Sequence, residues 1–494
     1  MVEVTESEVT EHDCLYSAVR ELAAKSPAAV AVVGYDGARS SYAQLVTAAD
    51  TVAEQLRIDA AGARVLGLAV DDPFTLVSVY FAAAKLKKIV VLLDSRLSES
   101  EKAHRVTKFD IDALVSDRAS RPGSIVVEPG NRTEATGRVS DYAADDFVIH
   151  CTSGSTGEPK GIVLSQRAIA ARVRSWSAEM ALGQTDVVLC ALPLWHCHGI
   201  DILTLPALLS GATVVFARGA HLTGRGLARM IEEHSVTFIS GLPVMYHMLA
   251  ATRGVEPAQL ATLRIAITGS APISAETQDL VRSRFGLSLR QVYGLSEIGA
   301  ITYDSACAGG GTVGTPMKGI EWRLEPSAVR AGEVELCELY VRAPSLARGY
   351  YRDEPATAAM FVNGWLRTRD LVEARPGGWF VRGRLSSFIN VSGNKVAPVD
   401  VESVLRRCPG VVDCAVAGIP DGDDEQVAAL VVTESRWDIA DIRRNTSSAL
   451  LPYQAPQLYR VVESIPRTPI GKIDYDAVKR LLTDGTAAAG RGAR

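Results

Sequence analysis

Residues 152–161 carry the clearest signal for chemistry, reading Thr-Ser-Gly-Ser-Thr-Gly-Glu-Pro-Lys-Gly directly after the apolar run 147–149. This order indicates a strand that runs into a small, hydroxyl-rich turn. Three glycines let a polyanion approach exposed backbone N–H groups, four hydroxyls add donors, and Lys160 adds a positive charge. The Walker pattern has Gly-Lys-Ser/Thr opening a helix, whereas Pro159 precedes this lysine and Gly161 follows it, so a P-loop NTPase is disfavoured.

A second stretch follows a strand predicted over 187–192 and contains His196-Cys197-His198. A His-x-His pair suggests metal ligands, but no carboxylate or third ligand lies at matching spacing, so a metal site is disfavoured. A histidine can also donate a hydrogen bond beside developing negative charge, or it can be a satisfied structural residue. Cys197 is expected to be structural.

A third stretch, 291–297, reads Gln-Val-Tyr-Gly-Leu-Ser-Glu. The ring of Tyr293 could stack on a base, and the carboxylate of Glu297 could hold the Mg²⁺ that accompanies a triphosphate. Ser296 could bond a phosphate oxygen. A single Glu on a loop is usually solvated, so the weight of this stretch depends on its companions in the chain.

Two alternating periodicities predict the elements that position these residues. Val/Ile/Leu-rich strands between amphipathic helices imply a buried, mostly parallel sheet, and ligands bind at the strand carboxyl ends of such sheets. Helices are predicted over 15–24, 42–56, 74–86, 166–180, 223–234 and 275–285. Strands are predicted over 29–33, 65–70, 89–93, 187–192, 213–216, 237–240 and 264–268. A compact α+β unit follows, with helices over 399–407 and 439–450 and strands over 411–419, 427–432 and 458–462.

Composition narrows the class of protein. The 494 residues are too many for one ordinary core, so at least two domains are expected. The formal net charge of −5 argues against nucleic acid as a partner. Eight cysteines form no CxxC pair, which fits a reducing, cytoplasmic location. Residues 1–14 are acidic and unlike a signal peptide, and lysines interrupt the apolar stretch 74–93, so no membrane span is expected.

The decapeptide at 152–161 resembles the signature loop of the AMP-forming adenylate enzymes, which include acyl-CoA synthetases, peptide-synthetase adenylation domains and firefly-type luciferases. Companion motifs follow in family order as far as residue 473. The resemblance implies an α/β fold with a large N-terminal domain, 1–384, of mostly parallel sheets and flanking helices. A small, mobile C-terminal α+β domain, 387–482, would carry the catalytic lysine, and 483–494 would be a disordered tail.

The resemblance also implies roles for individual residues. Lys472, which closes Pro-Arg-Thr-Pro-Ile-Gly-Lys, would bridge the carboxylate and the phosphates. The other catalytic residues would be His196, Glu297 and Thr152, with Glu297 as the metal ligand. Residues expected to bind ATP or AMP are Thr152, Ser153, Gly154, Ser155, Thr156, Gly157, Lys160, Gly269, Ser270, Ala271, Pro272, Tyr293, Gly294, Ser296, Asp370 and Arg384. Residues expected to line the acyl group are Trp195, His196, Gly241, Val244, Met245 and Ile298. Ser386 would be the hinge, and Gly393 would lie on the CoA side.

Three positions depart from the family pattern. Arg369 replaces a glycine, Ser386 stands at a hinge position that is usually Asp or Lys, and Asn390 stands where many members carry Lys. A small hydroxyl residue can still absorb a backbone rotation, because a hinge needs permissive dihedral angles rather than charge. These departures motivate an alternative from another class, a non-catalytic nucleotide-binding relative. The retained Glu297, Asp370 and Lys472 argue against it.

The implied reaction is ATP-dependent activation of a carboxylic acid to acyl-AMP with release of pyrophosphate, then transfer of the acyl group to a thiol. ATP, Mg²⁺ and CoA are the implied cofactors. Trp195, Met245 and Ile298 suggest an apolar wall, and His196 stands where amino-acid-activating domains hold an Asp for the α-amine. A fatty, aryl or polycyclic acid is therefore expected rather than an amino acid. No acyl-carrier domain follows in the chain, so free CoA is favoured over a separate carrier protein. Oxidative luciferase chemistry stays open.

Overall fold

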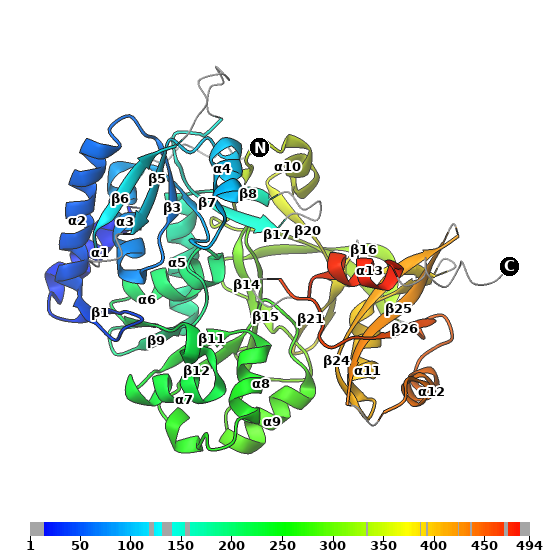
Figure 1. The fold of residues 1–494 in the computed structure, drawn as a ribbon. Helices are drawn as coiled ribbons and strands as arrows, with labels where there is room; N and C mark the ends of the chain where they lie inside the picture. The colour runs from blue at the N-terminus through cyan, green and yellow to red at the C-terminus, as the bar shows by residue number, and fades with distance from the viewer. Residues whose placement is uncertain are drawn as a thin grey trace.

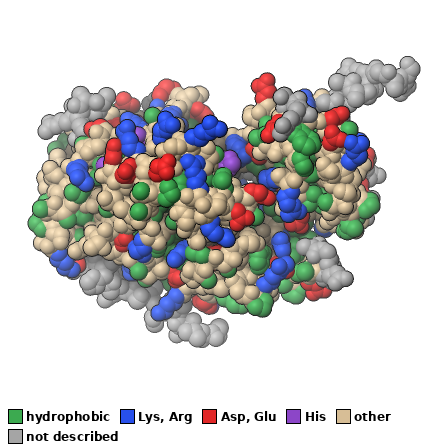
Figure 2. Space-filling model, turned by 90° about the horizontal axis from the view of Figure 1, so that it is seen from below, with side chains coloured by type: hydrophobic (Ala, Val, Ile, Leu, Met, Phe, Trp, Pro, Cys, Tyr) green, Lys and Arg blue, Asp and Glu red, His purple; other side chains and the backbone are tan. Residues whose placement is uncertain are grey.

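The structure is a computed structural model that describes residues 14–117, 123–130, 141–153, 159–331, 334–385, 387–391, 394–422, 424–434, 437–468 and 473–484. These residues form a large lobe that runs to strand β21 (Gly378–Arg384) and a small lobe that begins at β22 (Ile389–Val391). Figure 1 shows the small lobe beside the large one, next to β16 and β21. Figure 2 shows an indentation where the two lobes meet. The predicted domain boundaries at 384 and 387 stay predictions.

The first sheet of the large lobe has seven strands in the order β18-β8-β7-β4-β3-β5-β6. Its central pairs, β5 with β3, β3 with β4 and β4 with β7, are parallel, and its outer pairs are antiparallel. The strands are β3 (Val65–Ala69), β4 (Ile89–Leu92), β5 (Ala113–Asp117), β6 (Ile125–Pro129), β7 (Asp146–Ser153), β8 (Pro159–Ser165) and β18 (Gly349–Tyr350). Of the residues expected to bind phosphate, Thr152 and Ser153 therefore end β7, and Lys160 lies in its antiparallel partner β8.

The second sheet has nine strands in the order β15-β14-β13-β12-β11-β9-β10-β1-β2. The six strands from β1 to β13 in this order pair in parallel, as the apolar runs predicted. The strands are β1 (Val30–Val33), β2 (Arg39–Ser41), β9 (Val187–Cys190), β10 (Thr213–Phe216), β11 (Phe238–Gly241), β12 (Ile265–Thr268), β13 (Arg290–Leu295), β14 (Gly299–Tyr303) and β15 (Thr315–Pro316).

A third sheet in the large lobe is entirely antiparallel, which the sequence pattern did not predict. Its strands are β16 (Glu321–Ala331), β17 (Val334–Arg342), β19 (Phe361–Val362), β20 (Trp365–Arg375) and β21. Along β17 buried and exposed positions mix, because one face is only partly covered. This sheet places Asp370 on β20 directly opposite Arg384 on β21.

The helices of the large lobe pack on the two larger sheets (Figure 1). Helix α5 contacts β7 and β8 of the first sheet and β14 of the second, so it lies between them. Its Ser165 cap accepts from Ala168 N at 3.1 Å, and Trp176 is fully buried in a core shared by both sheets. The helices are α1 (Leu15–Lys25), α2 (Tyr42–Asp59), α3 (Pro73–Leu86), α4 (Glu99–Lys108), α5 (Gln166–Met180), α6 (Leu205–Leu209), α7 (Gly224–Glu233), α8 (Pro243–Ala251), α9 (Ala275–Phe285) and α10 (Glu354–Met360). A π-helical segment η3 (His198–Thr204) and 3₁₀ turns η4 (Gly219–Leu222) and η5 (Pro257–Leu260) complete the set.

The small lobe is α+β, as expected. Its strands are β22, β23 (Asn394–Val396), β24 (Val411–Asp421), β25 (Asp424–Thr433) and β26 (Leu458–Val461), and its helices are α11 (Pro398–Arg407), α12 (Ile439–Ala449) and α13 (Tyr475–Asp484). The expected tail from 483 is corrected at its start, because α13 continues to Asp484; residues 485–494 lie outside the described ranges. None of the helices in the described ranges is long and apolar enough to cross a membrane.

Candidate active site

The hairpin of β7 and β8 fixes the two sides of the expected phosphate loop. Thr152 and Ser153 end β7, and Thr152 lies opposite Lys160 in the register of the two strands. The Lys160 ammonium is 3.8 Å from an Asp353 carboxylate oxygen and 5.3 Å from the centre of the Tyr350 ring. The loop itself, with Gly154, Ser155, Thr156 and Gly157, lies outside the described residues.

Glu297 is clasped by a second segment that the sequence did not single out. The Tyr350 hydroxyl donates to Glu297 Oε1 at 2.6 Å, and Ala347 N donates to the Glu297 carbonyl oxygen at 2.7 Å. Burial, followed by the negative charge of Glu297, raises the pKa of Tyr350 above its ordinary value, so this hydroxyl stays protonated and donates. The only sequence signal for it is the run Gly349-Tyr350-Tyr351, and a pair 53 residues apart is invisible to local patterns.

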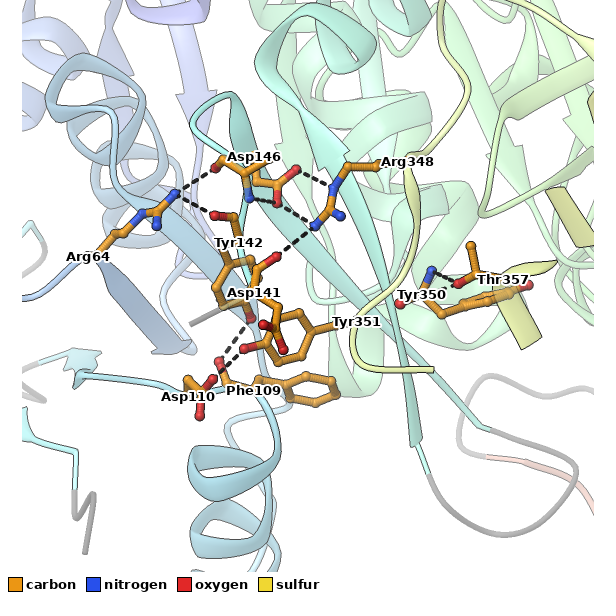
Figure 3. Close-up of polar contacts among 11 residues, drawn as sticks. Arg64, Phe109, Asp110, Asp141, Tyr142, Asp146, Arg348, Tyr350, Tyr351 and Thr357 are labelled. Carbon is orange, nitrogen blue, oxygen red and sulfur yellow. Dashed lines mark hydrogen bonds and ion pairs between the residues drawn. The ribbon is translucent and has the colours of Figure 1, made fainter. Parts of the chain in front are cut away.

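The segment that carries Tyr350 is tied to the first sheet (Figure 3). Arg348 makes a two-pronged contact with Asp146, with Nε to Oδ1 at 3.0 Å and Nη2 to Oδ2 at 2.7 Å. The rings of Tyr142 and Tyr351 stack with centres 4.2 Å apart. Tyr350 itself lies opposite Ile162 on β8, two residues beyond Lys160, because β18 pairs with β8.

Tyr293, Asp370 and Arg384 meet at the end of the antiparallel sheet. The Tyr293 hydroxyl donates to Asp370 Oδ2 at 2.6 Å, and Arg384 Nε donates to Oδ1 at 3.2 Å. Burial raises the pKa of Asp370 above its ordinary value, an effect that the charge of Arg384 opposes and that of Glu297 reinforces. Asp370, foremost, and Glu297 raise the pKa of Arg384. Four predicted site residues thus influence one another's charge: Tyr293, Glu297, Asp370 and Arg384.

Arg369 is accommodated without entering this cluster. Its backbone has φ of +59°, a left-handed conformation that glycine adopts without strain. Its side chain is exposed, and its carbonyl oxygen accepts from Leu385 N at 2.8 Å. The departure from glycine therefore costs some backbone strain, and it leaves the buried carboxylate of Asp370 in place.

Both histidines of the His-x-His stretch contribute to the site. His198 is buried between two serines, with Nδ1 3.0 Å from Ser270 Oγ and Nε2 2.8 Å from Ser240 Oγ. Its backbone N–H donates to His196 Nδ1 at 3.2 Å, which orients that ring. Sequence reasoning selected His196 and Ser270 but not His198. Among the described residues no group of three or more His, Cys, Asp or Glu side chains is arranged to hold a metal ion.

The glycine and serine positions of the remaining motifs lie around this centre. Cys197 Sγ is 3.1 Å from Ser296 Oγ, which joins the His-x-His stretch to the 291–297 motif. Gly269 is the first residue after β12, and a Cβ on it would lie 2.6 Å from Val292 Cγ1. Ala271 and Pro272 continue the loop after Ser270. The segments 269–272 and 291–297 are adjacent because β12 pairs with β13.

The residues expected to line the acyl group do not gather around one cavity, because Ile298, Trp195 and Met245 pack in three different hydrophobic clusters. Ile298 is buried and borders a cavity whose other walls are Arg172, Ser175, Trp176, Ile202, Ala300, Met317, Ile320 and Ser345. Trp195 packs against the main core, and Gly241 lies against Met245, whose sulfur would be 2.9 Å from a Cβ on that glycine. Val244 is 45% exposed on α8 and does not join this wall.

Gly294 shows why the 291–297 motif needs a glycine. It pairs with Ala300 in the β13–β14 hairpin, and a Cβ on it would lie 2.3 Å from the Gly299 carbonyl oxygen. Gly294→Ala is therefore expected to destabilise the fold by about 1–3 kcal/mol through overpacking. Urea denaturation measures this, with Gly183→Ala as the matched control, because no atom lies within 4 Å of a Cβ at Gly183. Equal midpoints for the two variants would contradict the steric account.

Lys472, Ser386 and Gly393 lie outside the described residues. Two hydrogen bonds join the residues on either side of the predicted hinge. Ser387 Oγ donates to the Arg384 carbonyl oxygen at 2.8 Å and accepts from Arg384 N at 3.1 Å. The small lobe contacts the large one here through a cluster of Val329, Leu336, Leu371, Phe388 and Ala397.

This arrangement defines an α/β enzyme of the adenylate-forming class: two sheets with parallel cores, polar residues gathered at their strand ends, and a small α+β lobe beside them. The chain belongs to the AMP-binding enzyme family. The model of the AMP-binding enzyme matches residues 19–351, and the model of the AMP-binding enzyme C-terminal domain matches residues 400–472. The resemblance predicted from the motifs is thereby confirmed.

Relatives and solved structures agree with this family. A feruloyl-CoA synthase of Amycolatopsis sp is 29% identical over 92% of this chain and 96% of that protein. An indoleacetate–CoA ligase of Aromatoleum aromaticum is 30% identical over 69% of this chain and 68% of that protein. ATP-bound MatB from Rhodopseudomonas palustris matches with a TM-score of 0.82 at 21% identity, over 96% of this chain and 99% of that one. The predicted fold class is confirmed.

Proposed function

We propose that this chain is an AMP-forming carboxylic acid:CoA ligase. A carboxylate oxygen of the acid attacks the α-phosphorus of ATP, the bond to the bridging oxygen breaks, and pyrophosphate leaves with acyl-AMP remaining. The sulfur of CoA then attacks the acyl carbon, the thiol loses its proton, and AMP leaves. The observation that carries the proposal is the convergence of Glu297, Tyr293, Asp370 and Arg384 in a chain of this family.

The described residues support distinct roles in nucleotide binding. Asp370 would accept both ribose hydroxyls, and Tyr293 and Arg384 hold its carboxylate in a fixed orientation. Segment 269–272 and the ring of Tyr293 would border the adenine. Thr152, Ser153 and Lys160, at the base of the hairpin, would bind phosphate oxygens together with Gly154, Ser155, Thr156 and Gly157. Gly294 and Ser296 would complete this side.

Glu297 fits Mg²⁺ by the chemistry of its donor set. A carboxylate oxygen is a ligand that Mg²⁺ prefers, and this ion binds through one or two carboxylates together with substrate phosphates. Tyr350 donates to Oε1, so the carboxylate is oriented before any ligand arrives. The ion would supply charge neutralisation on the triphosphate. His196, Lys160 and Lys472 would offset the remaining repulsion between the carboxylate and the phosphates.

The acid is proposed to be apolar, with aryl acids first. The buried apolar side chain of Ile298 supports this choice. Relatives of this chain include enzymes named for feruloyl, 4-coumarate and indoleacetate. Trp195, Gly241 and Met245 stay predicted acyl-lining residues. Cytoplasmic location, rotation of the small lobe about Ser386, and approach of CoA past Gly393 stay predictions.

Pyrophosphate release with MgATP and a panel of aryl, fatty and polycyclic acids, with and without CoA, tests the proposal. We expect acid-dependent release, and acyl-CoA as product when CoA is present. Release without acyl-CoA would point to a separate carrier protein as acceptor. MgATP binding without release for any acid would favour the non-catalytic nucleotide-binding relative and contradict the ligase.

A further inference from the structure

A buried cluster of three ionisable side chains lies between the two large sheets. Arg172 on α5 places Nη1 2.6 Å from Asp201 Oδ2, and His150 on β7 places Nε2 3.0 Å from the same oxygen. The side chains of Arg172, Asp201 and His150 are 2%, 0% and 2% exposed, so water cannot screen the charges of Arg172 and Asp201. None of the three belongs to the motifs that carry the proposed chemistry.

The pair of Arg172 and Asp201 is ionised. Burial by itself raises the pKa of a carboxyl group, but the contacts with His150 and Arg172 overcome this and lower the pKa of Asp201 below its ordinary value. Asp201 therefore anchors one end of the guanidinium. Buried ion pairs are weak evidence for stability, because desolvation offsets much of their attraction. The contacts of the second amino group of Arg172 indicate a further role for the pair.

The second amino group of Arg172 reaches two backbone carbonyls. Nη2 donates to the Ser296 carbonyl oxygen at 3.2 Å and to the Ser345 carbonyl oxygen at 3.3 Å. These two residues begin the segments that close on Glu297: Ser296 precedes it, and Ser345 leads to the Ala347 N–H and the Tyr350 hydroxyl that contact it. A planar guanidinium presents several donors in a fixed fork, so it can hold all three partners at once.

Gly299 shows that the fit around Arg172 is close. It has φ of +91°, and a Cβ on it would lie 2.9 Å from Arg172 Nε and 3.0 Å from Arg172 Cδ. The turn that follows Glu297 therefore packs directly on the guanidinium stem. On the opposite side, His150 lies two residues before Thr152 on β7. The cluster thus joins the strand of the phosphate hairpin to the turn that carries Glu297.

We propose that Arg172, held by Asp201, is a positioning residue that fixes the carboxylate of Glu297 for Mg²⁺. It acts through the carbonyls of Ser296 and Ser345, not by touching substrate. The inference rests on the proposed function for the role of Glu297, but the holding of the two segments is a property of the fold and can be measured without any reaction.

Arg172→Lys separates positioning from folding. A lysine keeps the cation beside Asp201, but its single ammonium cannot reproduce the fork to both carbonyls. We expect the Mg²⁺ concentration for half-maximal ATP binding, measured by calorimetry, to rise about tenfold, because partners that orient a metal ligand typically carry effects of this size. The Arg172 side chain is 2% exposed and that of Arg264 is 41% exposed, so urea midpoints of both variants are measured and Mg²⁺ dependence is compared only between folded proteins.

Arg264→Lys is the matched control. The Arg264 guanidinium also joins a carboxylate, Asp186 at 3.0 Å, to two backbone carbonyls, those of Met180 at 3.0 Å and Ala181 at 3.5 Å, away from Glu297. It is expected to keep the wild-type Mg²⁺ dependence. Equal Mg²⁺ dependence in both variants would overturn the positioning role.

Two further measurements keep the test decisive. If Arg172→Lys does not fold, Asp201→Asn, which still accepts from Arg172, is expected to show the same shift in Mg²⁺ dependence to a smaller extent. If wild type binds no MgATP, the proposed function fails, and amide hydrogen exchange then decides the positioning. Exchange over 293–299 and 345–350 is expected to be faster in Arg172→Lys than in wild type or Arg264→Lys; unchanged exchange would refute it.

Discussion

Glu297→Gln is expected to lower the rate of acid-dependent exchange between pyrophosphate and ATP, which reports on acyl-AMP formation, by about 10²-fold or more. Glutamine has the size of glutamate and can still accept from the Tyr350 hydroxyl, so the clasp on this side chain is retained. The change removes the negative charge that would bind Mg²⁺. Loss of one preorganised electrostatic contact to the reacting phosphates costs about 3 kcal/mol of barrier.

Exchange rates over a Mg²⁺ titration distinguish a lost ligand from a damaged fold. The variant is expected to need more Mg²⁺ for half-maximal rate and to remain slow at saturation. Glu276→Gln is the control, because Glu276 is exposed in the first turn of α9 and belongs to no predicted site. A Mg²⁺ dependence identical to that of wild type would remove Glu297 from the metal site.

Periodicity predicted most of the parallel strands and many of the helices. Helices 166–180 and 275–285 were predicted with the bounds that α5 and α9 have in the structure. Each begins after a serine whose side chain accepts from the third residue on, Ser165 from Ala168 N and Ser274 from Thr277 N. Both partners of such a hydrogen bond lie within a few residues of each other, so the sequence alone can indicate it.

The third sheet was missed for the opposite reason. Its strand β17 pairs with β20, whose residues are about 30 positions away, and the register between them shifts at a bulge. Only partial cover of one face blurs the alternation of polar and apolar residues. The register that brings Asp370 opposite Arg384 follows from the β20–β21 hairpin rather than from any motif.

The site shows the same division between local and distant signals. Tyr293 and Glu297 were found in a short run of characteristic residue types, and Asp370 was found through the resemblance to the family. The contacts of these residues were not predicted: Tyr350 is 53 residues from Glu297, and the Tyr293–Asp370 bond joins residues 77 apart. Which carboxylate is clasped, and by what, depends on tertiary packing. Arg172, an arginine in the middle of an amphipathic helix, has no sequence signal that distinguishes it from a solvated charge.

The first half-reaction is expected to depend on Lys472 far more than the second. In the proposed mechanism this lysine bridges the carboxylate and the phosphates only while acyl-AMP forms, and rotation of the small lobe then withdraws it before the thiol enters. Lys472→Ala is therefore expected to lower pyrophosphate exchange by about 10²- to 10³-fold. Conversion of chemically supplied acyl-AMP and CoA to acyl-CoA is expected to stay within a few fold of wild type.

Comparing the two half-reactions makes this prediction specific. A variant that is simply unstable loses both reactions together, whereas loss of a charge used in one conformation affects one of them. Lys479→Ala provides the control, because Lys479 is an exposed lysine on α13 of the same lobe and is expected to retain both rates. If Lys472→Ala loses both half-reactions equally, the small lobe does not present different residues to the site in each step. A fixed lobe would keep the lysine in place during both.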